Sequence, residues 1–344
     1  MKPLRRIASW LIAPPLLFSA FHLSAETPEA SASYLSHPKA QAFMKEVVAE
    51  GLISEQGIQT LLGSAEKKQS ILDAISRPAE KTKTWGQYRK IFLTQDRIEK
   101  GLSFYKEHQA TFERAEQEFG VPRHIILAII GVETRYGKHK GSYRVVDSLS
   151  TLAFDYPPRS KFFRSELKHF LYLDKEAGID LMNAKGSYAG AMGYGQFISS
   201  SYRHYAVDFD GDGNRDLLTN PVDAIGSVAN YFKQHRWKTG EPVASVARVI
   251  VQPAKANAVA SIVNQGLKPT LTIQEIKQAG LLPDALYPDN AKATAMELEG
   301  DEGIEYWVGL QNFYVITRYN HSPLYAMAVY QLSEEFRKRL ETKG

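Results

Sequence analysis

The stretch "IILAIIGVETRYG" at residues 125–137 places a carboxylate, Glu133, shortly after six consecutive apolar residues. Residues 122–136 have the spacing of a helix. At 100° per residue, Glu133 falls on the same helix face as Ile126, Ile129 and Ile130. We therefore expect this carboxylate to point toward the protein interior.

Burial among apolar groups penalises the charged form of a carboxylic acid and raises its pKa. Glu133 could then hold a proton near neutral pH and deliver it to a leaving group, as a glycosidase general acid does. The alternative is structural: Glu133 ends the helix at the surface, or pairs with Arg135 or Lys138. Position alone favours this structural alternative.

Helical patterns dominate the first two thirds of the chain. Short ones are expected at 38–51, 55–65 and 67–78, punctuated by glycine and proline. A long amphipathic helix is then predicted, ended by Gly120 and Pro122, with one apolar stripe: Ile98, Leu102, Tyr105, Phe112 and Phe119. Further helices are predicted at 159–178, 221–237 and 322–340.

The amino-acid composition changes after residue 242. Four segments rich in β-branched and aromatic residues predict strands at 246–251, 293–298, 305–310 and 313–319. Between them, 272–280 is a short helix with a Thr272/Glu275 capping box. The pattern predicts a mainly α (α+β) protein with these parts: signal peptide 1–25, flexible lead-in 26–37, α subdomain 38–90, core 91–242, small antiparallel β subdomain 243–310, and a C-terminal segment 311–344 that returns to the core and the α subdomain.

The N-terminus has the layout of a secretory signal. A basic start, an apolar segment broken by Pro14 and Pro15, and small residues predict cleavage after Ala25; a retained anchor is the alternative. Loss of the basic residues Lys2, Arg5 and Arg6 would lower the formal net charge from +4 to +1. The basic balance thus gives no support for a nucleic-acid partner.

The chain contains no cysteine. It therefore has no disulfide, no thiol nucleophile and no cysteine for a lipid anchor. The histidines lack HExxH spacing, and no GxSxG or phosphate-binding loop occurs. An exported, periplasmic protein without a stable membrane anchor is expected.

Glycine and aromatic residues gather in "YAGAMGYGQF" at 188–197. Glycine lets backbone approach a ligand closely, while tyrosine and glutamine supply flat apolar faces and amide hydrogen bonds. These groups suit the binding of sugar rings. An aromatic turn packed in a core is the alternative.

The segment "DFDGDGNRDLLT" at 208–219 has the oxygen-ligand spacing of an EF-hand loop. Asp208, Asp210 and Asp212 alternate, and Gly213 stands at the sixth position, where a sharp turn is needed. Thr219 replaces the usual glutamate at position twelve, so Asp223 is expected to complete the shell. The loop predicts a structural Ca²⁺ site; the alternative is an acidic loop without an ion.

Taken in order, "GVETRYG", "GSYAGAMGYGQF", the acidic loop followed by "NPVDAIGSVANYF", and "TRYNHS…YA" resemble the lytic murein transglycosylase B family. The matches run from about residue 40 to the C-terminus. The resemblance implies a lysozyme-like α core and a glycan groove, with Glu133 in the position of the catalytic glutamate. It further implies these groove residues: Tyr88, Ser187, Met192, Gln196, Tyr231, Tyr319, Asn320 and Tyr325.

The same resemblance implies calcium ligands at Asp208, Asp210, Asp212, Asn214 and Asp223, and peptidoglycan glycan strands as the partner. The implied reaction breaks the β-1,4 bond between N-acetylmuramic acid and N-acetylglucosamine and leaves a 1,6-anhydro ring. One acid suffices for this reaction because the C6 hydroxyl of the substrate is a tethered nucleophile. A hydrolysing muramidase and a non-catalytic, calcium-stabilised wall-binding protein are the competing hypotheses.

Overall fold

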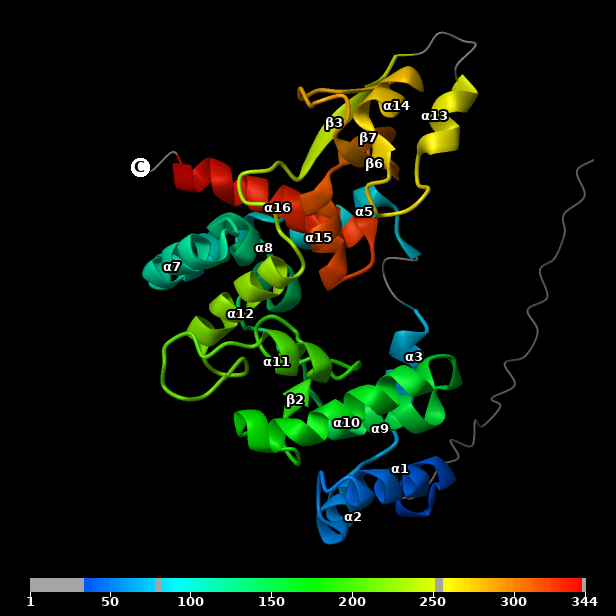
Figure 1. Cartoon of the computed structure of the whole chain (residues 1–344), viewed down its shortest axis with the longest axis vertical. Coiled ribbons are helices and arrows are strands. Elements are labelled where there is room, and N and C mark those ends of the chain that lie inside the picture. The colour runs from blue at the N-terminus through cyan, green and yellow to red at the C-terminus, as the bar shows by residue number, and fades with distance from the viewer. Residues whose placement is uncertain (1–33, 78–81, 251–255, 342–344) are drawn as a thin grey trace, which may run out of the picture.

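The computed structural model describes residues 34–77, 82–250 and 256–341, so the predicted signal peptide lies outside the described residues. The first layer comprises η1 (Tyr34–Ser36), α1 (Pro38–Ala49), α2 (Glu55–Ser64) and α3 (Gln69–Ile75). In Figure 1, α1 and α2 lie below α9 (Val145–Asp155) and α10 (Ser160–Ala177), whereas α3 lies above them, and both α2 and α3 contact α9. The three predicted short helices are confirmed.

The flexible lead-in was predicted to extend to residue 37. Its predicted end is wrong, because residues 34–36 form the short helix η1. Tyr34 is only 2% exposed, and its hydroxyl donates a hydrogen bond to the Asp155 carboxylate at 2.8 Å. Its ring also packs against Phe154, with 5.4 Å between the centroids. Tyr34 therefore fastens the start of the described chain to α9.

The central helices are α6 (Gln95–Glu107), α7 (Gln109–Phe119), α8 (Arg123–Thr134), α11 (Ser199–Tyr205) and α12 (Pro221–Gln234). The single long helix predicted across the first two is wrong, because the backbone leaves the helical region at His108. The break lets the rings of Phe104 and Phe112 meet edge to face, 6.0 Å apart. Gly120 ends α7 in the left-handed conformation, as predicted.

Helix α8 is the centre of the molecule. It contacts α6, α7, α12 and α16 (Pro323–Glu341), so it is enclosed by segments from both halves of the sequence. Figure 1 shows the C-terminal helix α16 running back across α8. The C-terminal segment returns to the core, as predicted.

The predicted strand at 313–319 is instead helix α15 (Gln311–Tyr319). Its β-branched composition was misleading because tertiary contacts decide the conformation here. The buried Asn312 side chain accepts a hydrogen bond from the backbone of Lys238 and donates to the carbonyls of Lys238 and Glu241, each at 2.8 Å. These bonds anchor the first turn of the helix.

The β subdomain is a five-stranded antiparallel sheet in the order β4-β6-β7-β3-β5. Its strands are β3 (Ala244–Val249), β4 (Leu271–Thr272), β5 (Leu281–Pro283), β6 (Lys292–Glu299) and β7 (Ile304–Gly309), accompanied by α13 (Ala256–Ile262) and α14 (Ile273–Gln278). A small separate core lies beneath the sheet. The predicted Thr272/Glu275 capping box is confirmed. Outside the β subdomain, β1 (Tyr143–Arg144) and β2 (Lys185–Gly186) form a second sheet of two strands.

Helix α5 (Trp85–Phe92) falls within the predicted N-terminal subdomain, 38–90, but the structure places it elsewhere. It packs against α16 and β6, far from α1 and α2 (Figure 1). The predicted boundary at residue 90 is therefore too late. The physical reason is Trp85, which is 1% exposed and hydrogen-bonded to Glu305 of β7.

Candidate active site

Glu133 lies on the last turn of α8, one residue before the helix ends at Thr134. The apolar run before it, residues 125–130, is between 0% and 1% exposed. Glu133 itself is half-buried, so its carboxylate lies where the core meets the surface. The helix face it shares with three isoleucines is thus an interior face, as its spacing predicts.

The chain turns sharply after Glu133. Arg135, Tyr136 and Gly137 have φ angles of 53°, 60° and 83°, in the left-handed region. The Thr134 hydroxyl accepts the Gly137 N–H and donates to the carbonyl of Tyr194, both at 2.9 Å. Thr134 therefore ties the end of α8 to the glycine-rich turn.

Tyr325, on α16, makes the defining contact of the site. Its hydroxyl donates a hydrogen bond to Glu133 Oε1 at 2.5 Å, although 192 residues separate the two in sequence. Tyr325 is 3% exposed, and burial followed by the negative charge of Glu133 raises the pKa of its phenol well above the usual value. The phenol therefore stays protonated and serves as a donor.

Tyr319 and Tyr231 stand beside this pair, with their ring centroids 4.7 Å apart. The Tyr319 hydroxyl donates to the Gly195 carbonyl and the Tyr231 hydroxyl to the Arg318 carbonyl, both at 2.6 Å. Burial raises the pKa of both phenols, and Glu133 contributes to each shift. Both hydroxyls bind backbone, and the Tyr231 ring is 7% exposed and stacks on His235, with 4.0 Å between the centroids.

The glycine-rich turn is held by its own backbone. Met192 exchanges N–H···O bonds with Phe197 at 2.9 and 3.0 Å, and Gln196 has a φ of 49°. The Gln196 amide donates to the carbonyl of Gly193 at 2.9 Å. Gly193 has a φ of 73°, and a Cβ there would lie 2.1 Å from the Leu217 carbonyl oxygen, so only glycine fits.

The structure brings together only part of the predicted groove. Met192 is 0% exposed and supports the turn from the interior, so its side chain presents no surface to a ligand. The Ser187 hydroxyl accepts the N–H groups of Ala189 and Ala191 and stabilises the turn. Asn320 follows the end of α15 in an extended conformation and is half-buried.

Tyr88 comes from α5 and is 2% exposed. It lies near enough to Tyr325 to contribute to the raised pKa of that phenol. Its ring packs against Phe92, with 5.1 Å between the centroids. Tyr88 is thus an interior residue of a helix that packs against α16.

Arg97 was not predicted as a site residue. Its guanidinium is 9% exposed and donates to the carbonyls of Gly131 in α8 and Ile91 in α5, the latter at 3.3 Å. It therefore links the helix that carries Glu133 to the helix that carries Tyr88. No local pattern signals this role, because an arginine on an amphipathic helix ordinarily faces water.

The next three acids along the chain have hydrogen-bond partners other than Glu133. Asp147 accepts the N–H of Glu66, Asp155 bonds to Tyr34 and Lys67, and the buried Glu166 accepts the N–H of Ser200. All three carboxylates hold other segments together. Glu133 is thus the acid that meets the aromatic cluster.

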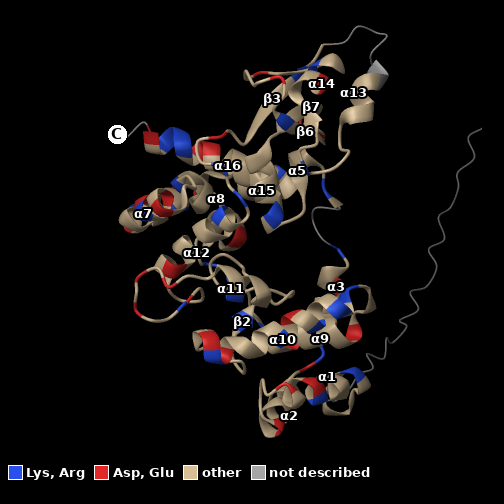
Figure 2. Ribbon diagram, in the orientation of Figure 1, with Lys and Arg blue, Asp and Glu red and all other residues tan. Residues whose placement is uncertain are grey.

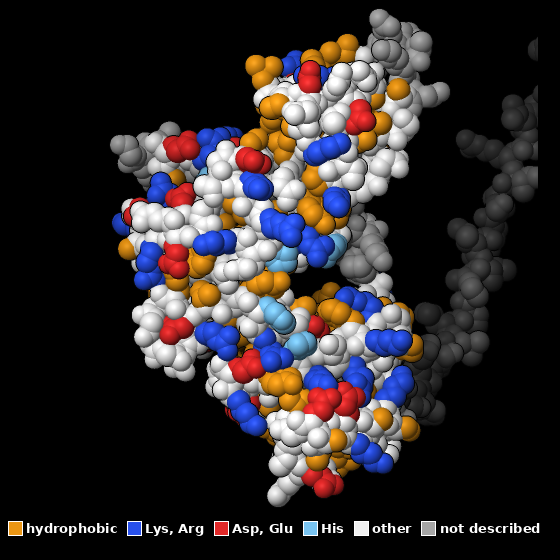
Figure 3. All heavy atoms as spheres, viewed as in Figure 1, with side chains coloured by type: hydrophobic (Ala, Val, Ile, Leu, Met, Phe, Trp, Pro, Cys, Tyr) orange, Lys and Arg blue, Asp and Glu red, His pale blue; other side chains and the backbone are white. Residues whose placement is uncertain are grey.

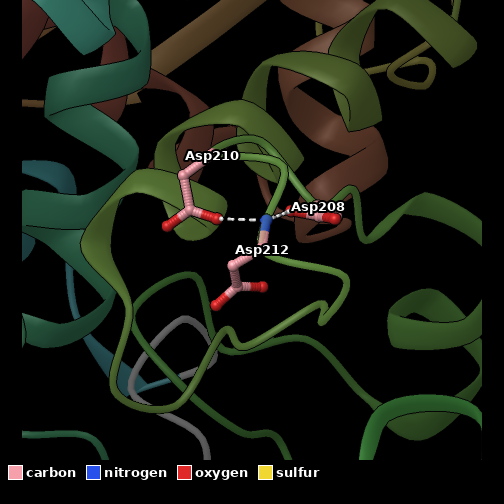
Figure 4. Close-up of side chains that lie close together, drawn as sticks. All are labelled: Asp208, Asp210 and Asp212. Atoms are coloured by element: carbon pink, nitrogen blue, oxygen red, sulfur yellow. Dashed lines mark hydrogen bonds between the residues drawn. The ribbon is translucent and has the colours of Figure 1, made fainter.

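The acidic loop 208–219 joins α11 to α12, and Figure 2 shows it as a loop at the edge of the ribbon with its acidic positions in red. Asp208, Asp210 and Asp212 each place a carboxylate oxygen within 4.8 Å of the others (Figure 4). The Asp208 carboxylate also accepts the backbone N–H groups of Gly211 and Gly213, at 2.7 and 2.8 Å. Three convergent hard oxygen donors fit Ca²⁺.

The other two predicted ligands play different parts. Asp223 is 0% exposed and accepts the N–H groups of Phe209 and Asp216, at 2.6 and 2.8 Å. Burial raises the pKa of this carboxyl group. Asn214 donates its backbone N–H to Asp212. Asp223 therefore fastens the loop at both ends, and the convergent group comprises only the first three aspartates.

The space-filling view shows a hollow between the part around α15 and the part around α9 and α10 (Figure 3). Lysine, arginine and histidine side chains stand at its edges. Tyr319 and Asn320, at the end of α15, lie on the upper of these two parts. The hollow therefore borders the element that carries two of the predicted groove residues.

These features define a protein with a single-carboxylate site on a mainly helical core. The chain belongs to the family described as "Transglycosylase SLT domain", whose model matches residues 36–334. It is 42% identical to membrane-bound lytic murein transglycosylase B of Escherichia coli (strain K12) over 310 residues, covering 88% of this chain and 83% of that protein.

Solved structures of lytic transglycosylases are similar to this chain in fold. Soluble lytic transglycosylase SltB1 from Pseudomonas aeruginosa matches with a TM-score of 0.82 and 51% identity, over 88% of this chain and 100% of that one. The Escherichia coli lytic transglycosylase Slt35, in complex with calcium, matches with a TM-score of 0.80 and 42% identity, over 89% and 94%. Among the described residues of this chain, no helix is both long and apolar enough to cross a membrane.

Proposed function

We propose that the protein is a peptidoglycan lytic transglycosylase. It cleaves the β-1,4 bond between N-acetylmuramic acid and N-acetylglucosamine and leaves a 1,6-anhydromuramic acid end. The observation that carries this proposal is the hydrogen bond from Tyr325 to Glu133, the one carboxylate among the aromatic side chains of the site. Membership of the transglycosylase family supports the same reaction.

Glu133 acts twice in this reaction. Its protonated carboxyl group first gives a proton to the glycosidic oxygen, and the bond from the anomeric carbon to that oxygen breaks. The N-acetyl group of the substrate stabilises the positive charge left on the anomeric carbon. The Glu133 carboxylate then takes the proton of the C6 hydroxyl as that oxygen bonds to the anomeric carbon, which restores the acid.

Tyr325 has a different role in each half of this cycle. Its protonated phenol holds the Glu133 carboxyl group in one orientation while the proton moves. When Glu133 is ionised, the same hydrogen bond stabilises the carboxylate. The glycan strand lies in the hollow beside α15, the helix that ends with Tyr319.

We further propose that the acidic loop holds a structural Ca²⁺. Asp208, Asp210 and Asp212 supply convergent oxygens, and the calcium complex of Slt35 supports the assignment. The ion would offset two of the three negative charges that these aspartates bring together before α12. It takes no part in the glycan chemistry.

The proposed location is the periplasm, where the murein wall lies. The basic and apolar N-terminal sequence supports export, and the absence of cysteine removes a lipid anchor of the cysteine type. The relative from Escherichia coli is named as a membrane-bound enzyme of murein. This chain would reach the same substrate as a protein released from its signal peptide.

Mass spectrometry of digested peptidoglycan tests the reaction. We expect fragments that end in 1,6-anhydromuramic acid, which are lighter by one water than hydrolysis products. Fragments with a reducing muramic acid end would instead establish a hydrolysing muramidase. Binding to peptidoglycan without any released fragment would establish a wall-binding protein and refute the proposal.

A further inference from the structure

Glu305 of β7 joins the β subdomain to α5. Its Oε2 atom accepts the indole N–H groups of Trp85 at 3.2 Å and Trp307 at 3.1 Å. Its Oε1 atom accepts a hydrogen bond from the Arg89 guanidinium at 3.3 Å. Two of these three donors, Trp85 and Arg89, belong to α5.

The turn between β6 and β7 also contacts α5. A Cβ added at Gly86 would lie 2.9 Å from the backbone nitrogen of Asp301, so the turn and the first residues of α5 are in close contact. The Asp301 carboxylate also pairs with Lys90 at 2.5 Å and with Arg89 at 3.7 Å. The hairpin therefore holds α5 at both its start and its middle.

Helix α5 also carries Tyr88, which lies three residues after Trp85 and therefore on the same side of the helix. Tyr88 is 2% exposed, and its helix packs against α16, which carries Tyr325. Tyr325 in turn bonds to Glu133. A path of contacts thus runs from the β subdomain through α5 to the proposed general acid.

We propose that Glu305 is a positioning residue for catalysis: through Trp85 and Arg89 it fixes α5, so that Tyr88 holds Tyr325 against Glu133. This inference rests on the proposed function and assigns the β subdomain a part in it. A buried or half-buried site of this kind loses rate when its supporting side chains shift by a fraction of an ångström. The chemistry itself remains with Glu133.

Glu305→Gln is the sharpest test because it keeps the shape of the side chain. A carboxylate accepts at both oxygens, whereas an amide presents one acceptor and one donor. The amide N–H₂ must then face either the two indole N–H groups or the guanidinium. At least one of the three hydrogen bonds is then lost, and we expect the contact between β7 and α5 to loosen.

The measurements are kcat and KM on peptidoglycan fragments, together with the release of anhydro ends. For Glu305→Gln we expect kcat to fall about tenfold, with KM within about twofold of the parent, since Tyr88 presents little surface to the substrate. Arg89→Gln removes one donor only and should give a smaller loss in the same direction. Asp284→Asn is the matched control, because it breaks the exposed Arg248–Asp284 pair of the same subdomain, at 2.7 Å, and touches none of these groups.

A double-mutant cycle separates positioning from a merely structural role. If Glu305 acts through Tyr88, Glu305→Gln should have almost no further effect on kcat in a Tyr88→Ala background. Additive losses, or an unchanged kcat in a folded Glu305→Gln protein, would overturn the inference. Failure of the parent protein to release anhydro ends would refute the proposed function instead, so the two failures are distinguishable.

Discussion

The acidic loop and the Glu133 site are built in opposite ways. In the loop, Asp208, Asp210 and Asp212 are neighbours in sequence and hydrogen-bond to backbone within a few residues. At the Glu133 site, the essential contact joins residues 192 positions apart. A local site can be recognised from a short motif, whereas a site assembled from distant segments exists only in the folded chain.

The largest expected effect tests the assembled site at its centre. Glu133→Gln removes the exchangeable proton and keeps the side-chain volume, so turnover should fall by roughly a thousandfold or more, within the range for general acid–base groups. Sedimentation with insoluble peptidoglycan should show that binding is retained. A variant that still releases anhydro ends at the parent rate would show that Glu133 is not the acid.

The second prediction breaks the contact between the distant segments. Tyr325→Phe removes the hydrogen bond to Glu133, and bonds to charged groups contribute about 1.5–3 kcal/mol, so kcat should fall about tenfold to a hundredfold. Tyr330→Phe is the matched control, since that tyrosine lies on the same helix and donates to the Ala244 carbonyl at 3.0 Å. Equal losses in both variants would indicate a general disturbance of α16.

The same contrast explains which parts of the structure could be predicted. The helix of Glu133, the capping box of α14 and three of the four predicted strands, β3, β6 and β7, follow from local spacing and were predicted correctly. Helix α15 and the break at His108 were not, because Asn312 bonds to Lys238 and Phe104 packs against Tyr194, both far away in sequence. For the same reason, sequence reasoning missed Arg97, whose partners lie on two other helices.

Family resemblance supplied what local physics could not at the candidate site. It selected Tyr319 and Tyr325 out of 18 tyrosines, and the structure places both in the cluster around Glu133. It also selected Met192, whose burial shows that the position shapes the turn from inside. A motif therefore identifies positions, and only the packing shows what each side chain does there.

The third prediction concerns the local site. Added Ca²⁺ should raise the melting temperature of the protein, because an ion that binds only the folded state stabilises it by about 2.7 kcal/mol at a hundred times its Kd. Asp208→Asn should abolish this response by removing a charged ligand oxygen. A chelator that leaves the melting temperature of the parent unchanged would exclude a structural ion in this loop.

The comparison also predicts that the two sites are separable. Asp208→Asn, assayed below the melting temperature, should retain kcat within about threefold, since the ion takes no part in proton transfer. Tyr325→Phe, by contrast, should leave the calcium-dependent shift in melting temperature intact. If both variants lost both properties, the loop and the Glu133 site would form one cooperative unit.

The smallest effect should come from the N-terminal cap of α14, whose two partners are three residues apart. Thr272→Ala removes the hydroxyl that accepts the Glu275 N–H at 3.1 Å at the start of α14. Loss of such a cap costs about 1 kcal/mol, and denaturant unfolding followed by circular dichroism should show it. Thr270→Ala, two residues before the cap, controls for the change of residue type.

Because α14 packs within the separate core of the β subdomain, kcat should not change in Thr272→Ala. A loss of turnover would mean that the β subdomain transmits even small changes to α5. A local change in the sheet would then alter the site at Glu133, and the two could not be treated as separate.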